Sequence, residues 1–426
     1  MQHVELRPVE KATYWAWVIC GLAAIYYCYE YFLRITPSVI TPELMRTYNL
    51  TGAEVGNLSA FYYHAYMPMQ IVVGLLMDRF GPRRLLTLAC LLCAIGTYLF
   101  AGTSSLTIAM MGRFLVGFGS AFAFVGALKL ATIWLPANRF ALISGIITCL
   151  GMLGAMAGDI VLRRFVDITG WQTTIYASAF AGVVLAAILW LVVRDVNPRY
   201  PAPHQHMMYF RDLMIGLWGA IKNGQVWLSS LVGFLLYISL SAFGEMWGIP
   251  YLEQAQGLSR TEAASANAMI FLGWAIGAPF WGWFSDFVSR RRLLLIISSI
   301  AAALLACIML YVPGLSLVFT CTLLFLLGFF TSAEILVFAI CREVSSIAMV
   351  GTAIALTNMI VMVGGNIFQP LMGKILDLNW TSTMIDGARI YPASAYAIAL
   401  AVLPVGFGLA AILSFFIRET YGKIKV

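Results

Sequence analysis

The sequence predicts an all-α membrane protein with twelve transmembrane helices, arranged as two pseudo-symmetric halves of six helices each. Composition gives the first reason: of 426 residues, 61% are hydrophobic and only 11% are charged. A soluble globular domain carries about 25% charged residues, so this chain lacks the polar surface that folding in water requires. The other two reasons are the length of its apolar runs and an internal repeat.

The apolar runs have the length of membrane-spanning helices. A helix needs about 20 mostly apolar residues to cross a bilayer, and Pro, Gly and charged residues delimit each run. The twelve runs are 14–36, 52–77, 85–103, 106–134, 140–161, 171–193, 226–251, 263–287, 293–312, 316–341, 348–373 and 393–417. The longest polar break contains three prolines and leaves six runs on each side. We therefore expect an N-terminal bundle over 1–194, a cytoplasmic linker over 195–222 and a C-terminal bundle over 223–426.

A short motif occurs twice, about half a chain apart. Segment Gly74–Arg84 has the sequence GLLMDRFGPRR, and segment Gly282–Arg292 has the sequence GWFSDFVSRRR. Each copy begins at the end of the second run of its half and continues into the loop after it, and Asp78 and Asp286 are 208 positions apart. Duplicated halves of this kind are typical of secondary transporters.

The basic residues predict the orientation in the membrane. If the N-terminus is cytoplasmic, 17 of the 26 Lys and Arg residues fall on the cytoplasmic side, 6 on the opposite side and 3 within spans. Cytoplasmic loops of membrane proteins carry an excess of Lys and Arg. We therefore expect both termini in the cytoplasm. The net charge of +7 is then explained by the basic residues of the cytoplasmic loops, and it does not indicate a nucleic-acid partner. The expected surroundings are the lipid bilayer.

The first copy of the repeated loop resembles a family motif. The stretch GLLMDRFGPRRL is similar to the loop motif G-x-L-x-D-R-x-G-R-R/K-x-L of the major facilitator superfamily, and GRFLVGFGSA is similar to its R-x-x-x-G-x-G pattern. The resemblance implies the fold of that superfamily and a cytoplasmic gate that stabilises the outward-open state. The expected gating residues are Gly74, Asp78, Arg79, Gly81, Arg83, Arg84, Arg113 and Asp286. The alternative is that the loop arginines only anchor the topology.

Two details of this gate are expected from the residue types. Gly74 has no side chain and is expected to let neighbouring helices approach closely. The second copy has Ser289 where Gly81 stands in the first copy, and no Arg directly follows Asp286. We therefore expect the second copy to form the weaker latch.

Ionisable residues also occur inside the apolar runs. Each charge at the centre of a membrane helix costs about 2.5–3.5 kcal/mol on insertion scales, so these residues must face other helices or a water-filled cavity. They are Glu30, Arg34, Arg113, Lys129, Asp159, Glu245 and Glu334, with His64 beside them. In the fold that the resemblance implies, spans 1, 4, 7 and 10 line the central cavity. Those four spans carry Arg34, Lys129, Glu245 and Glu334.

The pair Glu30 and Arg34 predicts how protons and an anion are coupled. The two residues are four positions apart and therefore share one helix face. Arg34 is a fixed cation whose planar fork suits a carboxylate or a phosphate. Deprotonated Glu30 pairs with Arg34, whereas protonated Glu30 frees Arg34 for an anionic ligand. The alternative is a structural pair that holds span 1 against its neighbours.

The remaining candidates are polar groups on the same or adjacent spans. The expected substrate contacts are Arg34, Lys129, Tyr26, Tyr27, Tyr63, Tyr237, Asn358 and Asn366. The expected proton-coupling residues are Glu30, Glu334, Glu245, His64 and Asp159. The alternatives are core packing for the tyrosines and His64, helix–helix hydrogen bonds for the asparagines, and an outer-rim salt bridge for Asp159.

These features predict a proton-coupled secondary transporter that works by alternating access. We expect it to import a small anionic or zwitterionic solute, such as a carboxylate, an amino acid or a carboxylate siderophore, across a bacterial inner membrane. The alternative is a drug or siderophore exporter driven by proton antiport, although span 5 lacks the Gly-Pro pair of the family's antiporter motif. The chain has no GxxxxGK[ST] loop, and we expect a monomer with no enzymatic activity, cofactor or metal.

Overall fold

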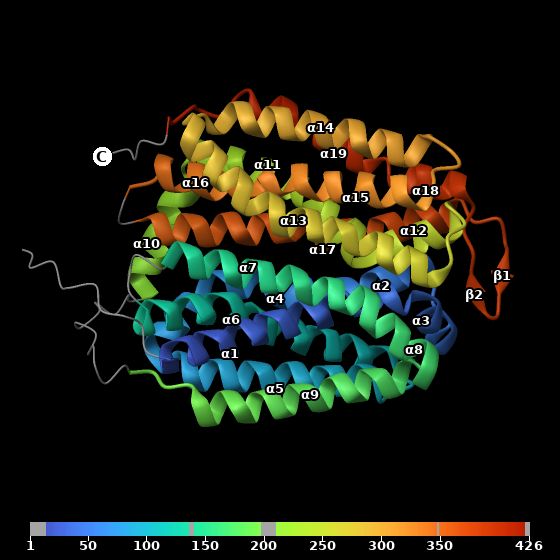
Figure 1. The fold of residues 1–426 in the computed structure, drawn as a ribbon, viewed down its shortest axis with the longest axis horizontal. Coiled ribbons are helices and arrows are strands. Elements are labelled where there is room, and N and C mark those ends of the chain that lie inside the picture. The colour runs from blue at the N-terminus through green and yellow to red at the C-terminus, as the bar shows by residue number, and fades with distance from the viewer. Residues whose placement is uncertain (1–13, 136–139, 197–209, 347–348, 422–426) are drawn as a thin grey trace, which may run out of the picture.

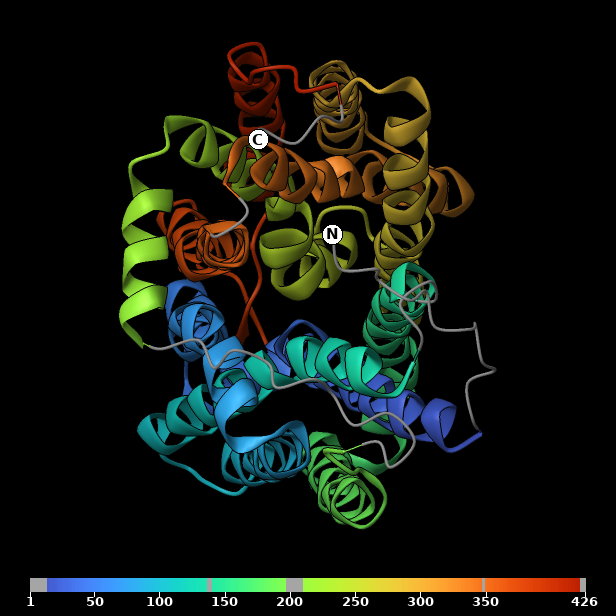
Figure 2. The same ribbon diagram turned by 90° about the vertical axis from the view of Figure 1, so that its left-hand side faces the viewer.

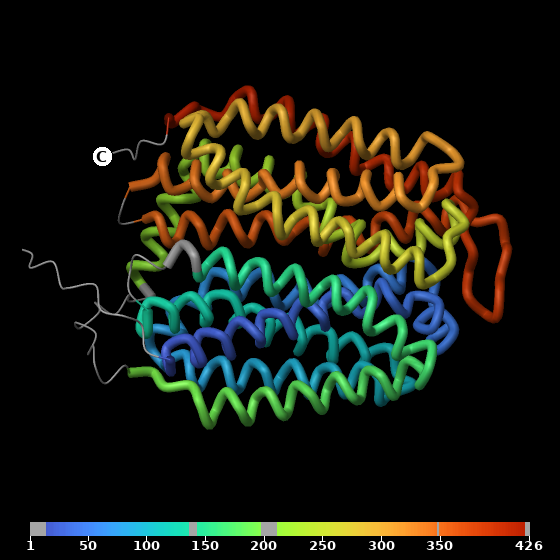
Figure 3. Tube along the Cα trace, viewed as in Figure 1, coloured from blue at the N-terminus to red at the C-terminus, as the bar shows by residue number. Residues whose placement is uncertain are grey.

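The computed structural model describes residues 14–135, 140–196, 210–346 and 349–421. Two groups of helices, α1 to α9 and α11 to α19, lie side by side along the long axis of the molecule (Figure 1). Eleven helical segments are long and apolar enough to cross a membrane, and α4 (Gly52–Phe80) runs alongside them as the twelfth (Figure 3). The predicted all-α fold with twelve membrane-spanning helices is confirmed. The two chain ends and residues 197–209 of the expected linker lie outside the described residues.

The first group contains six membrane-spanning segments. They are α1 (Tyr14–Arg34), α4 (Gly52–Phe80), α5 (Pro82–Ala101), α6 (Leu106–Trp134), α7 (Phe140–Ala157) continued by a π-helical segment (Gly158–Leu162) and α8 (Arg163–Thr169), and α9 (Trp171–Val192). The short helices α2 (Thr36–Val39) and α3 (Thr41–Tyr48) connect α1 to α4. Helix α10 (Phe210–Ile221) precedes the second group and packs against α17.

The second group repeats this arrangement with more irregular helices. Its segments are α11 (Gly224–Ile238) continued by a π-helical segment (Ser239–Trp247) and α12 (Gly248–Gln254), α13 (Arg260–Val288), α14 (Arg291–Tyr311), α15 (Leu317–Thr331) continued by a 3₁₀ turn (Ser332–Glu334) and α16 (Ile335–Val344), α17 (Val350–Leu378), and α18 (Ala393–Ala399) with α19 (Val402–Ser414). A small antiparallel hairpin, β1 (Met384–Ile385) and β2 (Ala388–Arg389), pairs Met384 with Arg389.

The second membrane-spanning helix of each group, α4 or α13, begins with a capping box. The Thr51 side chain accepts a hydrogen bond from the Glu54 amide, and the Glu54 side chain accepts one from the Thr51 amide. Ser259 and Glu262 form the same reciprocal capping box at the start of α13. The two boxes are 208 positions apart, which is also the spacing of Asp78 and Asp286. The duplication therefore extends along the whole second helix of each half.

The two groups meet tightly at one end of the molecule, the hairpin end, which carries β1 and β2 (Figure 1). There α4 and α17 touch backbone to backbone, and a Cβ added at Gly373 would lie 2.1 Å from the Gly52 carbonyl oxygen. The Asp377 carboxylate accepts hydrogen bonds from the Gly52 and Ala53 amides at 2.9 and 2.8 Å. These amides begin α4, where a negative charge is favourable. The hairpin end is therefore closed.

The Asp377 carboxylate also fixes the segment around the hairpin. Arg389 donates to it at 3.0 Å and the Tyr391 hydroxyl at 2.7 Å. Burial and the adjacent Asp377 carboxylate raise the pKa of Tyr391 above its usual range. Tyr391 therefore stays a hydrogen-bond donor to Asp377 throughout the physiological pH range.

Because the α4–α17 contact leaves no room for a methyl group, Gly373→Ala is expected to open the hairpin end. The clash involves backbone atoms, so one helix must shift. We expect the distance between spin labels placed at the exposed positions Glu54 and Lys374 to shift toward a longer population.

Gly408→Ala is the matched control for that substitution. It lies in α19, where an added Cβ meets no atom within 4 Å. It should leave the label distances unchanged. Unchanged distances in Gly373→Ala as well would show that the hairpin end is not the closed end in the membrane.

Candidate functional site

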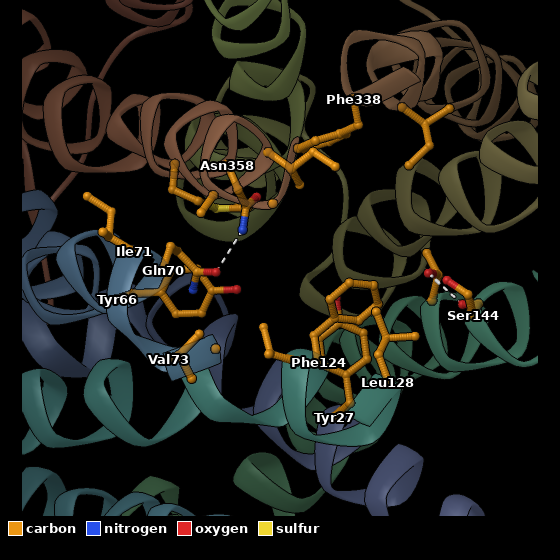
Figure 4. A pocket seen from close by; sticks show the side chains of 18 of the residues that line it. Tyr27, Tyr66, Gln70, Ile71, Val73, Phe124, Leu128, Ser144, Phe338 and Asn358 are labelled. Carbon is orange, nitrogen blue, oxygen red and sulfur yellow. Dashed lines mark hydrogen bonds between the residues drawn. The ribbon is translucent and has the colours of Figure 1, made fainter. Parts of the chain in front are cut away.

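A cavity of about 530 Å³ lies between the two groups of helices. Its lining residues extend toward one end of the molecule, the linker end. The linker end faces the viewer in Figure 2 and carries α10 and both ends of the described chain. Leu213 of α10 and Gly351 at the start of α17 line the cavity there, while Tyr27 and Tyr237 line its inner part. The close-up shows α4, α6 and α1 residues on one side and Phe338 and Asn358 on the other (Figure 4). The molecule is thus open at the linker end and closed at the hairpin end.

Arg34 lies behind a layer of tyrosines at the inner part of this cavity. Its guanidinium carbon is 4.1 Å from the centre of the Tyr31 ring and 4.9 Å from that of Tyr66. Its Nη1 donates to the Tyr237 hydroxyl at 3.2 Å. Tyr31, Tyr66 and Tyr237 all line the cavity, whereas the Arg34 side chain is only 1% exposed. These three rings therefore separate the cation from the cavity.

Two carboxylates from different halves hold Arg34. Glu30, one turn earlier on α1, forms an ion pair with Nη2. Glu245, on the π-helical segment between α11 and α12, lies with its Oε1 3.7 Å from Nη1. Tyr62 donates to Glu30 at 2.6 Å, and Tyr63 donates to Glu245. The expected pairing of Glu30 with Arg34 is thus present, and Glu245 joins it across the interface.

Arg113 completes this group from the other side. It donates to the Leu33 and Arg34 carbonyls at 3.0 and 3.1 Å. These carbonyls belong to the last turn of α1, where the helix offers them no amide partner. Arg113 therefore acts as the cap of α1. With it, the buried group holds two cations and two carboxylates when all four are ionised.

Three buried acids lie on irregular helix segments. Asp159 is in the π-helical segment Gly158–Leu162, Glu245 is in the π-helical segment Ser239–Trp247, and Glu334 ends the 3₁₀ turn Ser332–Glu334. Such interruptions inside helices often mark hinges or functional sites. They also turn the side chains that follow away from the direction that a regular helix would give.

The model of the Major Facilitator Superfamily matches residues 22–368 and 230–425. The chain belongs to this superfamily. A solved bacterial homologue of the human lysosomal transporter Spinster, in an inward-facing and occupied conformation, agrees with this fold. It has a TM-score of 0.78 at 18% identity and covers 96% of this chain and 98% of that one.

The curated relatives share a quarter or less of the aligned residues with this chain. The probable sulfoacetate transporter SauU of Cupriavidus necator is 25% identical over 64% of this chain and 66% of its own length, just under two thirds. The probable galactarate/D-glucarate transporter GudP of Escherichia coli is 23% identical over 66% of this chain and 68% of its own. The membrane sensor protein UhpC of E. coli is 23% identical over 92% of this chain and 93% of its own.

The superfamily loop motif lies at the linker end of α4. Asp78 pairs with Lys129 of α6 at 2.7 Å. The guanidinium carbon of Arg83 lies 4.3 Å from the centre of the Trp190 ring. The backbone amide of Arg83 donates to the Asp195 carboxylate at 2.7 Å. Gly81, two residues earlier, has a φ of +79°. Arg79 and Arg84 are exposed. The first copy of the motif therefore holds α4, α6 and the end of α9 together within one half.

One expectation about this motif differs from the structure. A Cβ added at Gly74 meets no atom within 4 Å, because Gly74 borders the open cavity instead of a neighbouring helix. In the second copy Arg291 takes the place of the missing neighbouring Arg. Arg291 pairs with Asp286 at 2.6 Å and with Glu343 at 3.1 Å, and its amide donates to Glu419 at 2.8 Å. That the second copy forms the weaker latch stays a prediction.

Other predicted residues lie away from the Arg34 group. The Tyr26 hydroxyl donates to the Gly119 carbonyl at 3.0 Å and does not line the cavity. His64 is exposed, with Nδ1 3.1 Å from the Ala60 carbonyl oxygen. Asn366 lies outside the cavity lining, and Lys129 is at the gate motif. Asp159 accepts a hydrogen bond from Asn267 of α13 at 2.7 Å and is fully buried.

The cavity also includes residues that the sequence patterns missed. Tyr31, Gln70 and Trp274 line it, and the Asn358 amide donates to Gln70 at 2.8 Å (Figure 4). The available signal was an uncharged polar or aromatic residue inside an apolar run, which many core positions share. Within the described part of the chain, no group of three or more His, Cys, Asp or Glu residues could hold a metal ion.

Proposed function

We propose that this protein imports a small organic anion or zwitterion together with protons, by alternating access, across a bacterial inner membrane. The observation that carries the proposal is the Arg34 group. A cation on α1 is held by Glu30 from its own half and by Glu245 from the opposite half, directly behind the cavity wall. Such a group links the protonation of an acid, the freedom of a cation and the contact between the two halves.

The sequence of events follows from competition for one guanidinium. In the linker-end-open state two carboxylates and a tyrosine hydroxyl surround the two terminal nitrogens of Arg34. Separation of the halves at the hairpin end would draw Glu245 away from Arg34, because the two residues lie on different halves. A substrate anion then takes the place of a carboxylate on Arg34. Protonation of Glu30 or Glu245 removes the competing charge.

Charge balance favours one proton for each negative charge of the bound ligand. The formal charges of the Arg34 group sum to zero when Arg34, Arg113, Glu30 and Glu245 are all ionised. Each of these side chains is at most 3% exposed. An added anion leaves an uncompensated charge in a buried site, which is costly. One proton on either Glu restores neutrality. The imported ligand and its protons therefore cross as a neutral set.

The relatives support the chemical class of the ligand. Sulfoacetate, galactarate and D-glucarate, named for two of them, are small organic anions, and a planar guanidinium suits carboxylate and sulfonate groups. Tyr27, Asn358 and Gln70 provide further polar groups in the cavity. Glu334 and Asp159 remain additional proton candidates of this proposal. His64 is the weakest, because it is exposed away from the cavity.

We assign the linker end to the cytoplasm. Arg79, Arg83, Arg84 and the cluster Arg290–Arg292 lie at that end, in line with the excess of basic residues in cytoplasmic loops. This assignment makes the described conformation inward-open, places both termini in the cytoplasm, and makes 195–222 a cytoplasmic linker between bundles 1–194 and 223–426.

Uptake into proteoliposomes with an imposed pH gradient tests the proposal. The labelled probes are sulfoacetate, D-glucarate, L-alanine and taurine. An inward proton gradient is expected to accelerate uptake of at least one probe, and a protonophore is expected to remove that acceleration. If no probe is taken up faster with the gradient than without it, proton-coupled import is wrong.

The first copy of the gate motif gives a separate prediction. Asp78→Asn removes the partner of Lys129 and is expected to lower uptake by about tenfold, roughly the effect of one charge-assisted hydrogen bond. We propose that Asp78 stabilises the outward-open state. In Asp78→Asn the label distance between Glu54 and Lys374 should therefore shift toward the shorter population, in which the hairpin end is closed. Asp286→Asn is the matched control. Its effect should be smaller, since Arg291 keeps Glu343. An equal effect of both changes would remove the special role of Asp78.

Two observations favour other functions. Much of the cavity wall is apolar, including Phe124, Leu128 and Phe338 (Figure 4), which suits the alternative of a drug or siderophore exporter. One relative that covers nearly the whole chain is named a membrane sensor, which suits binding without transport. Increased drug susceptibility of a deletion strain would support the exporter. Ligand binding with no measurable uptake would support the sensor.

A further inference from the structure

Glu334 is a buried carboxyl group in the cavity lining. It is 3% exposed and lines the cavity, and within the described part of the chain it has neither a hydrogen bond nor an ion pair from its side chain. The other lining acid, Asp78, is compensated by Lys129. The Arg34 group is compensated internally. Glu334 therefore differs from every other acid at this site.

The wall around Glu334 is aromatic. Phe338 follows it by one turn of the same span and also lines the cavity. Trp274 lines the cavity beside it, since its Nε1 donates to Thr331, one turn before Glu334, at 3.1 Å. Tyr237 packs edge-on against Trp274 with ring centres 5.7 Å apart. Aromatic faces attract cations, and an ionised carboxylate in a buried site requires one.

The two sides of the cavity are therefore chemically different. On one side, Tyr31 and Tyr66 cover Arg34, which is the proposed anion contact. On the other side, Glu334 stands among aromatic rings with no cation of its own. The hydroxyl of Tyr237 contacts Arg34 while its ring contacts Trp274, so the two sides adjoin. A ligand that spans them needs a negative and a positive end.

We propose that the ligand is a zwitterion whose ammonium group binds Glu334 within the wall of Trp274, Tyr237 and Phe338, and whose acid group binds Arg34. This inference rests on the proposed function, which leaves anion and zwitterion open, and decides between them. A dianion such as sulfoacetate would place its second negative charge against Glu334. The site should therefore select against it.

Binding of matched amine and hydroxyl pairs to the purified full-length protein tests this inference. The probes are glycine and glycolate, L-alanine and L-lactate, L-phenylalanine and L-phenyllactate, and taurine and isethionate. The members of each pair have nearly equal size and the same acid group, and they differ in the ammonium. At least one amine is expected to bind about tenfold or more tightly than its hydroxyl partner, as a charge-assisted contact implies.

Glu334→Gln is the decisive variant, because it keeps the shape and removes the charge. The amine and the hydroxyl of the preferred pair should then bind within about threefold of each other, since the one charge-assisted contact is gone. Asp78→Asn is the matched control: it removes the other cavity-lining carboxyl and should retain the amine preference.

The outcomes separate the two proposals. Equal binding of both members of every pair, abolished by Arg34→Lys, overturns the ammonium site and leaves the proposed anion site standing. An amine preference that survives Glu334→Gln also overturns the inference. Sulfoacetate is measured beside the four pairs as a ninth probe. If it binds more tightly than taurine, the ammonium site is overturned and Glu334 becomes a proton carrier for a dianion. Binding of none of the nine probes contradicts both proposals. Circular dichroism and size-exclusion profiles of Glu334→Gln confirm that the variant is folded.

Discussion

Replacing Arg34 with lysine is expected to lower the kcat/KM of uptake by about 100-fold or more. Lysine keeps the charge but loses the planar fork that reaches Glu30 and Tyr237 from separate nitrogens. Loss of one to two charge-assisted hydrogen bonds corresponds to about 10- to 1,000-fold. The measurement is initial uptake in proteoliposomes, normalised to the amount of folded protein.

Lysine is the informative change because alanine confounds stability with function. Arg34→Ala would leave two buried carboxylates without their shared cation, and breaking a buried pair typically costs 3–5 kcal/mol. Arg163→Lys is the matched control, since Arg163 is also buried but pairs with Glu43 and Asp167 toward the hairpin end. Its uptake should stay within about threefold, because Arg163 lies outside the cavity lining and lysine keeps the charge beside Glu43 and the partly exposed Asp167. A similar loss in both variants would mean that Arg34 acts only through folding.

The sequence predicts the Arg34 group better than the rest of the site. The spacing of Glu30 and Arg34 places them on one helix face whatever their neighbours are, because i,i+4 geometry is local. Their shared burial follows from the cost of a charge facing lipid. Local spacing is a poorer guide to which of two adjacent residues faces the cavity. Tyr26 and Tyr27 are consecutive, yet Tyr27 lines the cavity and Tyr26 packs against α6.

The other acids illustrate where such prediction stops. Asp159, Glu245 and Glu334 lie on π-helical or 3₁₀ segments, where an added or removed residue per turn changes which side chains face the cavity. No sequence signal marked these interruptions. Lys129 lies on a cavity-lining span as expected, but its depth along α6 brings it to Asp78. Gln70 and Trp274 were missed because uncharged residues in an apolar run raise no comparable energetic conflict.

Neutralising one acid of the Arg34 group is expected to uncouple uptake from the proton gradient. Wild-type uptake should fall as pH rises, because a proton must occupy Glu30 or Glu245 before an anion can take its place on Arg34. For one required proton, the rate falls about tenfold per pH unit once that acid is ionised. Glutamine mimics the protonated acid, so Glu30→Gln or Glu245→Gln should give a flat pH profile over the same range.

The two glutamine variants should also separate exchange from accumulation. Counterflow, in which external label exchanges for internal unlabelled solute, needs no net proton movement and should remain within about threefold of wild type. Accumulation driven by a pH gradient should fall by about tenfold or more, since the coupled protonation step is absent. The variant that loses accumulation identifies the proton carrier, and Glu262→Gln is the control, because Gln can still close the capping box of α13.

The position of the proton carrier has a structural consequence. Glu245 and Arg34 belong to opposite halves, so a proton on Glu245 weakens a contact across the interface. A proton on Glu30 weakens a contact within one half and leaves the interface intact. If Glu245 carries the proton, acidic pH should therefore lengthen the label distance between Glu54 and Lys374 in the wild type, and Glu245→Gln should show the longer distance at every pH. If Glu30 carries the proton, the label distance between Glu54 and Lys374 should be independent of pH in the wild type and in Glu245→Gln. If both glutamine variants keep the pH dependence of uptake that the wild type shows, the Arg34 group is excluded as the site of proton coupling.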